Sequence, residues 1–477
     1  MRDSSVIGLL SLCFVFSEAA AESPNIILVM ADDQGWGDVA YNGHPLLKTP
    51  NLDAAAATGL RFDRFYAAAP VCSPTRGSVM TGRHPNRYGV LSWGHVIRPQ
   101  EVTIAEALKT AGYATGHFGK WHLGSVRKTS PASPGVNGFD EWLSAPNFFD
   151  NDPILSHKGR AVQIAGESSM VTVDAALEWI ARQTQDAQPF LAVVWFGSPH
   201  SPHRAVDTDR RFYSTEQENL QHFYGEITGL DRAFGKLRDS IGELGIRENT
   251  LLWYCSDNGA LKRVGSAGPH RGKKGSVYEG GLLVPAILEW PARISSPRVI
   301  TARCNTCDIY PTLLEIAGVT IPGQPPLDGV SLVPRIDGSA SPRESPMGFW
   351  AYRAKGISTA SAQLMADLLA AQQAGGDLEA READKQAGRF PSPPAAEDKF
   401  PGHAAWVDGD WKLHRIEDRD GKVTWELYDL ARDAIESTDL AAGGEPRVQW
   451  MKADLLTWLQ SVARSLNGGD YPEVTSR

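Results

Sequence analysis

Short apolar runs alternate along the chain with stretches that have the spacing of amphipathic helices. The runs at 25–30, 190–196 and 251–254 each lead directly into polar residues, and 283–288 forms a fourth run. Buried strands that alternate with helices are typical of a parallel sheet covered by helices. The pattern therefore predicts an α/β fold with a large mixed, mostly parallel sheet sandwiched by helices.

The composition changes to Gly, Ser and Pro around 335–350, which indicates a boundary between two domains. We expect a larger domain over 22–345 and a C-terminal subdomain over 346–477. Within the second, 357–400 is rich in Ala, Gln, Asp and Glu and then in Pro. This stretch is predicted to be an exposed insertion made of a helix and a loose linker.

The end of the chain predicts a small α+β arrangement. The runs 411–416 and 423–428 are predicted as the strands of a hairpin, with Asp420-Gly421 at its turn. Residues 448–459 have helical spacing. The C-terminal subdomain is therefore expected to hold a short antiparallel sheet and a terminal helix.

Residues 1–21 have the features of a secretory signal peptide. Arg2 supplies a weakly positive start, 6–16 is a short apolar run, and 17–21 contains small residues suited to cleavage. The apolar run is too short to span a bilayer and no later run is long enough, so no transmembrane segment is expected. We expect export to the periplasm or the extracellular space, with a buried N-terminal helix as the alternative.

The chain has 477 residues, of which 42% are hydrophobic and 22% charged, as in ordinary globular proteins. Its formal net charge of −9 gives no support for nucleic-acid binding. The cysteines that remain beyond the signal segment do not form a disulfide framework. Cys304 and Cys307 form a single C-x-x-C pair without further zinc ligands at finger spacing, so a structural role is expected.

Two of the predicted strands end in paired oxygen ligands. Asp32 and Asp33 follow the first strand, and Asp257 and Asn258 follow the third. Ligands of open α/β sheets bind outside the carboxyl ends of the strands, and carboxylate and amide oxygens suit calcium or magnesium. These residues therefore predict a metal site, while helix capping by each Asp is the alternative.

Cys72 lies just before Pro74, which is typical of the first turn of a helix. A helix N-terminus favours an anion because its N–H groups are unpaired and the helix dipole points there. Arg76 lies one turn further on and can return towards Cys72. The segment is predicted to form an oxyanion environment, although a lone cysteine is more often a buried structural residue.

Two further segments offer cations. Lys120 and His122 are flanked by Gly119 and Gly124, and in an extended segment their side chains point the same way. The loop at 269–275 is densely basic and closely follows the Asp257 strand end. Both segments are candidates for the same site, and a solvated surface is the alternative for each.

These motifs together resemble the type I, formylglycine-dependent sulfatases, the arylsulfatase family of the alkaline phosphatase superfamily. The stretch 72–76 matches the C-x-P-x-R signature of that family, and 119–124 matches its second signature. The resemblance is strong over 24–335 and weak beyond. The remaining motifs occur in family order, namely Asp32-Asp33, Pro199-His200, Asp257-Asn258-Gly259 and Tyr278-Glu279-Gly280-Gly281.

The resemblance implies that a maturation enzyme oxidises Cys72 to formylglycine. As the hydrated gem-diol, this residue would attack sulfur to form a covalent sulfo-enzyme, and its second hydroxyl would then expel sulfate. One calcium ion would be held by Cys72 in its modified form and by the ligands Asp32, Asp33, Asp257 and Asn258.

The resemblance also assigns roles to the cations and histidines. Arg76 would orient the modified residue, and Lys120 and Lys274 would bind the sulfate oxygens. His200 would bind substrate and protonate the leaving alcohol, and His122 would accept the proton in the second step. The family loop usually has Gly before its catalytic Lys, whereas this chain has Lys273, so Lys273 competes with Lys274 for the role.

The expected activity is hydrolysis of a sulfate monoester on a sulfated small molecule or polysaccharide, because export fits sulfated carbohydrates outside the cell. Trp93, His95 and Arg98 are candidates to line a sugar site, with ordinary packing as the alternative. Two other functions stay open: a phosphonate or phosphate ester hydrolase of the same superfamily, and a catalytically silent homologue that binds sulfated glycans.

Overall fold

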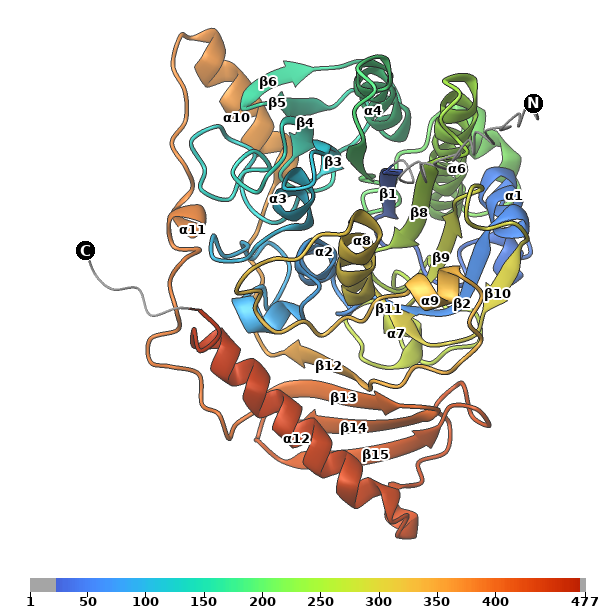
Figure 1. Ribbon diagram of the computed structural model, residues 1–477, viewed down its shortest axis with the longest axis vertical. Coiled ribbons are helices and arrows are strands. Elements are labelled where there is room, and N and C mark those ends of the chain that lie inside the picture. The colour runs from blue at the N-terminus through green and yellow to red at the C-terminus, as the bar shows by residue number, and fades with distance from the viewer. Residues whose placement is uncertain (1–22, 472–477) are drawn as a thin grey trace, which may run out of the picture.

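The computed structural model describes residues 23–471, and the predicted signal peptide at 1–21 therefore lies outside the described residues. Its main sheet has eleven strands with helices on both faces (Figure 1). The strands are β1 (Asn25–Ala31), β2 (Leu60–Tyr66), β3 (Ala114–Lys120), β4 (Glu141–Ala145), β5 (Ile154–His157), β6 (Arg160–Gln163), β7 (Phe190–Trp195), β8 (Thr250–Ser256), β9 (Leu283–Glu289), β10 (Arg298–Ile300) and β11 (Cys304–Asn305).

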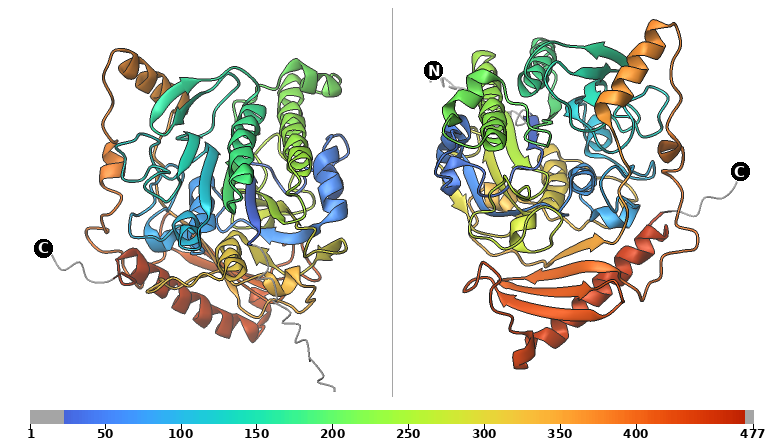
Figure 2. Two further views of the ribbon diagram at one scale, coloured as in Figure 1. Left: turned by 45° about the horizontal axis from the view of Figure 1, so that its top comes forward. Right: turned by 180° about the vertical axis from the view of Figure 1, so that it is seen from behind.

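The helices that accompany the main sheet divide between its two faces. Side chains of α2, α3 and α8 pack on one face, and those of α1, α4 and α6 pack on the other, an arrangement visible in Figure 2. The helices are α1 (Pro50–Thr58), α2 (Cys72–Thr81), α3 (Ile104–Lys109), α4 (Ser168–Gln185), α5 (Asp207–Arg210), α6 (Glu218–Glu243), α7 (Glu279–Leu282), α8 (Ile309–Ala317) and α9 (Val333–Ile336).

The strand order is β10-β2-β9-β8-β1-β7-β3-β4-β5-β6, with β11 paired to β2. Strands β8, β1, β7 and β3 are mutually parallel neighbours, whereas β9 runs antiparallel to β8 and β2. Alternate residues of the central strands fill the two cores, so these strands are apolar on both sides. The predicted α/β fold is confirmed, and the four predicted strands correspond to β1, β7, β8 and β9.

A separate four-stranded antiparallel sheet lies below the main sheet in Figure 1. One of its faces packs on the main body through Phe349 and Val407, and its other face packs on α12 through Trp350 and Leu459. Its elements are β12 (Met347–Tyr352), β13 (Gly402–Asp408), β14 (Trp411–Glu417), β15 (Val423–Asp429) and the helix α12 (Arg447–Leu466). The predicted hairpin and terminal helix are therefore present, while the domain division at 345 stays a prediction.

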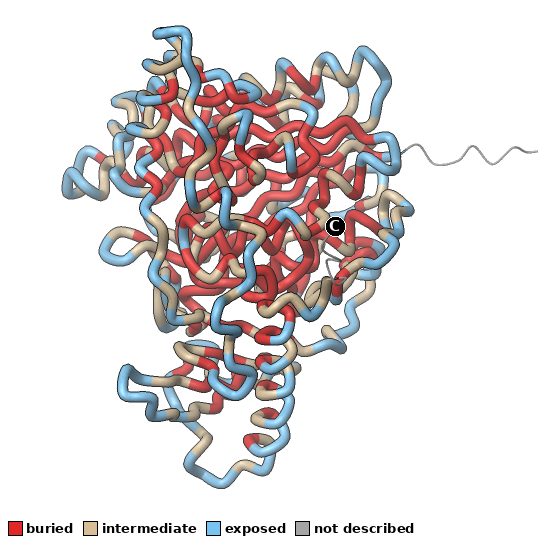
Figure 3. Tube along the Cα trace, turned by 90° about the vertical axis from the view of Figure 1, so that its left-hand side faces the viewer, coloured by how far each residue is buried: buried red, intermediate tan, exposed pale blue. Residues whose placement is uncertain are grey.

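The predicted insertion at 357–400 holds α10 (Ser361–Gln373) and α11 (Glu382–Lys385). α10 lies along the edge formed by β5 and β6, and its Gln372 side chain accepts a hydrogen bond from the Ala161 amide at 2.9 Å. Met365 and Leu368 are buried against the main core, so the helix is exposed on one face only. Figure 3 shows buried residues concentrated in the main body, with exposed ones along its outer connections. Within residues 23–471, no helix is both long and apolar enough to cross a membrane.

Candidate active site

The carboxyl ends of the central strands bring the predicted oxygen ligands together. Ala31 of β1 and Ser256 of β8 are register partners, so Asp32 and Asp257 leave the sheet side by side. The Asp257 amide donates to the Ala31 carbonyl at 3.2 Å, and the Asp32 amide donates to the Ser198 carbonyl beyond β7 at 3.0 Å. The edge of the sheet thus gathers residues from three strands at one point, as the sequence predicts.

Three buried carboxylates at this edge each contact a different cation. Lys120 Nζ lies 2.6 Å from Asp32 Oδ2, and Lys274 Nζ lies 2.5 Å from Asp33 Oδ1. Arg76 donates to Asp257 Oδ2 from Nε at 3.0 Å and from Nη2 at 2.7 Å. Buried charges are tolerated when they are paired and hydrogen-bonded, so the balance of charges allows this cluster to exist inside the protein.

Two oxygens among the predicted metal ligands lack hydrogen-bond donors within residues 23–471. They are Asp32 Oδ1 and Asn258 Oδ1, both buried. Burial raises the pKa of Asp32 to about 8, against the effect of Lys120, so this carboxylate lacks full compensation for its charge. A hard cation would supply both missing interactions. The donor set therefore fits a calcium or magnesium ion.

The potential ligand atoms of Asp32, Asp33 and His200 all lie within 4.8 Å of one another. Asp257 is oriented differently, since its Oδ1 accepts the Asp33 amide at 3.0 Å and its Oδ2 binds Arg76. His200 was not among the ligands expected from the sequence. Its Nε2 is 3.7 Å from Asp33 Oδ2, so the carboxylates and this histidine share one small volume.

Cys72 is the first residue of α2 and is almost fully buried. Burial raises the pKa of its thiol, whereas Lys120 and Lys274 lower it and Asp257 and Asp32 raise it further. The residue therefore lies within the electrostatic reach of all these charges, as the predicted oxyanion environment requires. The unmodified thiol is a weak nucleophile here because the thiolate is the reactive form.

Arg76 lies beneath the site as a fully buried cation. We expected it to return towards Cys72, but its hydrogen bonds go to Asp257 and to the Lys120 carbonyl, the latter at 3.1 Å. An ionised carboxylate is a stronger acceptor than a thiol, which explains the difference. Its guanidinium also lies 5.1 Å from the ring centroid of Trp195. Arg76 thus ties α2 to the ends of β3, β7 and β8.

The two adjacent lysines of the basic loop have different partners. Lys274 pairs with Asp33 in the site, whereas Lys273 Nζ donates to the Gly265 carbonyl at 2.6 Å. The loop backbone holds this arrangement, because the Lys274 amide donates to Ala260 O and the Gly275 amide to Pro70 O, both at 2.9 Å. The geometry therefore selects Lys274 over Lys273 for the role that the resemblance leaves open between them.

The C-terminal sheet anchors this loop through a buried ionic network. Lys412 Nζ of β14 donates to Glu279 Oε1 at 2.8 Å and lies 3.1 Å from Glu436 Oε1. Glu436 in turn accepts the Glu279 amide at 2.6 Å, and Glu279 Oε2 accepts the Tyr66 hydroxyl at 2.7 Å. The residues that follow Lys274 are thus held by both sheets.

His122 is buried in the site, but the prediction of one extended segment is wrong beyond Lys120. β3 ends at Lys120, and His122 has a φ of 54°, because the chain turns as it leaves the sheet. Both ring nitrogens lack hydrogen-bond partners within residues 23–471. Burial, together with Lys120 and Arg76, lowers the pKa of His122 well below its usual range. The ring is therefore neutral, and neither nitrogen is occupied by another described residue.

His200 is fixed in orientation by two neighbours. Its Nδ1 donates to the Ser201 carbonyl at 2.6 Å, and its ring stacks on Phe148 with centroids 4.3 Å apart and planes 16° apart. Burial lowers the pKa of His200 to about 3, against the effect of Asp33. The sequence analysis missed Phe148, although it lies shortly beyond the end of β4 and thus at the same edge of the sheet.

The three candidates for a sugar site have different environments. Trp93 is exposed, and the amide of the next residue, Gly94, donates to Ser73 Oγ at 2.8 Å, beside the start of α2. His95 bonds to backbone carbonyls at 89 and 355. Arg98 is buried and donates to the Leu466 carbonyl at 2.8 Å. Trp93 alone of these three residues presents a large exposed surface.

The fold and this site define an α/β protein with a cluster of paired carboxylates and cations at the carboxyl ends of its parallel strands. The family model for Sulfatase matches residues 24–319, and the chain belongs to the sulfatase family. It is 33% identical over 374 residues to N-acetylgalactosamine-6-sulfatase of Canis lupus familiaris, with 69% of each chain covered. It is 34% identical over 375 residues to arylsulfatase A of Homo sapiens, covering 70% of this chain and 72% of the relative.

The structural comparison extends over nearly the whole chain. The crystal structure of Ps i-CgsB in complex with k-i-k-neocarrahexaose superposes with a TM-score of 0.76 at 22% identity, covering 94% of this chain and 98% of that one. The likeness includes the C-terminal sheet, where the sequence resemblance is weak. The protein is an enzyme of the class that hydrolyses sulfuric esters.

Replacement of the two adjacent lysines tests the assignment of the loop. We expect Lys274→Met to lower kcat for an aryl sulfate by about 100-fold or more, as removal of an oxyanion-stabilising donor does. Lys273→Met removes the same charge one residue away and is expected to change kcat by about twofold at most. Steady-state kinetics on the two folded variants provide the measurement. A larger loss of kcat for Lys273→Met than for Lys274→Met would contradict the assignment of Lys274 to the site.

Proposed function

We propose that the protein is an exported sulfatase that hydrolyses a sulfate monoester on a sulfated carbohydrate, with Cys72 converted to formylglycine. The observation that carries the proposal is the buried position of Cys72 at the start of α2, where the charges of Lys120, Lys274, Asp257 and Asp32 act on its thiol. The relative named N-acetylgalactosamine-6-sulfatase supports a sugar sulfate as substrate. The apolar run at 6–16 supports export to the periplasm or the extracellular space.

Formylglycine, once formed by a maturation enzyme, supplies as its hydrate one hydroxyl for attack on sulfur and a second for release of sulfate from the covalent sulfo-enzyme. An unmodified Cys72 would serve poorly, since burial raises the pKa of its thiol. The start of α2 directs unpaired backbone N–H groups towards this residue and favours the negative charge of the sulfate. Arg76 fixes the helix against Asp257, so the reacting residue is held in place.

Lys120 and Lys274 are proposed to bind the sulfate oxygens. The Nζ of Lys120 already contacts Asp32, and the Nζ of Lys274 already contacts Asp33. An incoming sulfate would therefore bind lysines whose charges are already partly compensated by carboxylates. Charge that develops on the sulfate in the transition state is offset by donors fixed before the reaction. This arrangement stabilises the transition state without reorganisation of the site.

The two histidines are proposed to move protons at opposite sides of the sulfate. The Nδ1 of His200 is occupied by the Ser201 carbonyl, which leaves Nε2 for the leaving oxygen. His200 must be protonated to act, and a bound anionic sulfate raises its pKa from the low value of the empty pocket. His122 is neutral and unpaired, which suits the proton acceptor of the second step.

One calcium ion is proposed to be held by Asp32, Asp33, Asp257 and Asn258, with the modified Cys72 as a further ligand. The ion would polarise the sulfate and lower the pKa of the hydroxyl that attacks it. The unpaired oxygens of Asp32 and Asn258 support this ligand set. Lys120 Nζ lies 2.6 Å from Asp32 Oδ2 and would therefore stand beside the ion.

The activity is tested on protein whose Cys72-containing peptide shows conversion by mass spectrometry. We expect hydrolysis of an aryl sulfate to exceed that of the matched aryl phosphate diester and phosphonate by at least about 100-fold in kcat/KM, because the extra substituent of a diester or phosphonate replaces one of the three free oxygens that a sulfate offers to the two lysines. Dominant phosphodiesterase or phosphonate activity would refute the sulfatase proposal. Converted protein that binds sulfated sugars without turnover would indicate the silent homologue.

Calcium binding is tested by removal of one oxygen. Wild-type protein is expected to gain about 2.7 kcal/mol of unfolding free energy at a Ca²⁺ concentration 100 times its Kd. Asn258→Leu is expected to weaken binding by at least about tenfold, because it deletes the unpaired Oδ1. Asn258→Asp retains an oxygen and serves as the control. Calorimetric titration of both variants gives the result, and equal affinities for Leu and wild type would exclude this ligand.

The role of His200 is tested through leaving-group dependence. Activated aryl sulfates need little protonation of the departing oxygen, whereas sugar sulfates need it fully. We therefore expect His200→Ala to slow a sugar sulfate by at least about tenfold more than a nitrophenyl sulfate. Single-turnover rates on both substrates provide the measurement. Equal losses on the two substrates would contradict a role as general acid.

A further inference from the structure

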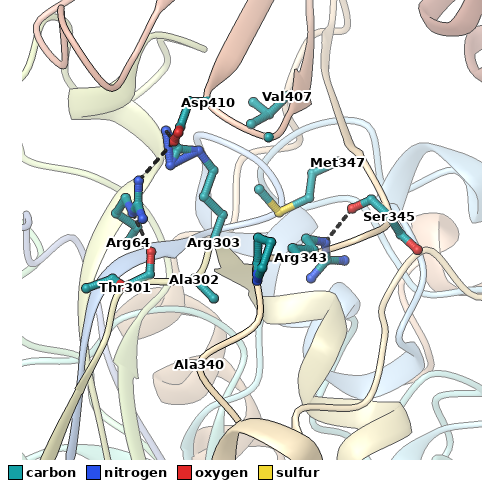
Figure 4. A pocket seen from close by; sticks show the side chains of 12 residues that line it. Arg64, Thr301, Ala302, Arg303, Ala340, Arg343, Ser345, Met347, Val407 and Asp410 are labelled. Atoms are coloured by element: carbon teal, nitrogen blue, oxygen red, sulfur yellow. Dashed lines mark hydrogen bonds and ion pairs between the residues drawn. The ribbon is translucent and has the colours of Figure 1, made fainter.

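A second cationic cavity lies between the main sheet and the C-terminal sheet (Figure 4). It has a volume of about 160 Å³ and is lined by residues of β2, of the segments that follow β10 and precede β12, and of the β13–β14 turn. Arg64, Arg303 and Arg343 line it, whereas Asp410 is its one acidic lining residue. Each of the proposed catalytic and metal-binding residues lies outside this lining, so the cavity is separate from the active site.

Arg303 lines this cavity, and two of its donors lack partners within the described residues. Its side chain is only 5% exposed, and its Nη2 lies 3.1 Å from Asp410 Oδ1. Its Nε and Nη1 are buried and have no hydrogen-bond partner within residues 23–471. A buried guanidinium with unpaired donors costs free energy, which an added acceptor would recover. The residue is therefore incompletely satisfied by the protein alone.

The charges around the cavity favour an anion. Asp410 Oδ1 is shared between Arg303 and Arg64, whose Nη1 lies 3.2 Å away. Arg343 is bound to the buried Asp308 through two hydrogen bonds of 2.7 and 3.0 Å. Three guanidinium groups are thus balanced by two carboxylates. Arg64 also donates from Nε to the Thr301 carbonyl at 2.6 Å, which fixes its side chain at the rim.

We propose that this cavity is a binding site for a tetrahedral oxyanion, namely sulfate, either as the free ion or as an ester group of a glycan chain. Guanidinium groups match the geometry of such oxygens with paired N–H donors. The volume exceeds what a single water molecule needs. A bound anion would offset the positive charge of Arg64 and Arg303, which also pair with Asp410 of the C-terminal sheet, and so strengthen the contact between the two sheets.

The test measures binding of radiolabelled inorganic sulfate by equilibrium dialysis. Lys274→Met serves as the parent, because it weakens the active site and leaves the cavity intact. We expect the parent to bind one equivalent of sulfate, and Arg64→Gln or Arg303→Gln in that background to weaken binding by at least about tenfold. Arg293→Gln is the matched control: Arg293 pairs with Asp337 at 32% and 46% exposure, as Arg64 pairs with Asp410 at 35% and 50%.

Equal sulfate binding by the parent and both cavity variants, or no binding by the parent, would overturn the proposal. Should Arg303→Gln fail to fold, the half-exposed Arg64 still provides the answer. In the otherwise wild-type chain, Arg64→Gln is expected to hydrolyse a small aryl sulfate within about twofold of wild type, which separates this site from the active site. Displacement of labelled sulfate by a sulfated oligosaccharide, but not by its desulfated form, identifies glycan ester groups as the source. Lack of displacement identifies the free ion.

Discussion

The balance between three buried carboxylates and three cations, of which Lys120 and Arg76 are buried and Lys274 is partly exposed, is the constraint on which the active-site edge depends. Asp32, Asp33 and Asp257 could not remain ionised inside the protein without Lys120, Lys274 and Arg76. The parallel register of β1, β7 and β8 delivers the carboxylates to one point. Each cation comes from a different segment, and so the charge pairs also join β3, α2 and the loop at 269–281. The same interactions thus fold the edge of the sheet and prepare it for an anionic substrate.

The C-terminal sheet takes part in this arrangement although it contributes none of the proposed catalytic side chains. Its Lys412 and the neighbouring Glu436 hold Glu279, which follows the loop that carries Lys274. The network is buried between two packed apolar surfaces, where hydrogen bonds are strong and unpaired groups are costly. The position of Lys274 relative to Asp33 is therefore set by contacts on both sides of the interface. This explains why the two sheets form one functional unit in spite of their separate cores.

The sequence predicted those parts of the molecule that depend on local patterns. Apolar runs ending in Asp32 and Asp257 located two strands and their ends, and Pro74 located the start of α2. Contacts between distant segments were not predictable in this way. The partner of Arg76 depends on the strand register, and the choice of Lys274 over Lys273 depends on loop hydrogen bonds to residues 70 and 260. Phe148 was missed because a single aromatic residue after a strand carries no pattern of its own.

The two cationic sites differ in how their charge is compensated, and this difference follows from what each must do. At the proposed active site Lys120, Lys274 and Arg76 are each paired with a carboxylate, which would keep sulfate binding moderate and allow the product to leave. At the second cavity two donors of Arg303 have no partner among residues 23–471, so the proposed anion would be held without any chemistry that would release it. Net positive charge between two sheets destabilises their contact through self-repulsion, and a bound anion removes that repulsion. An excess of guanidinium groups is thus suited to a structural ion, whereas paired charges are suited to turnover.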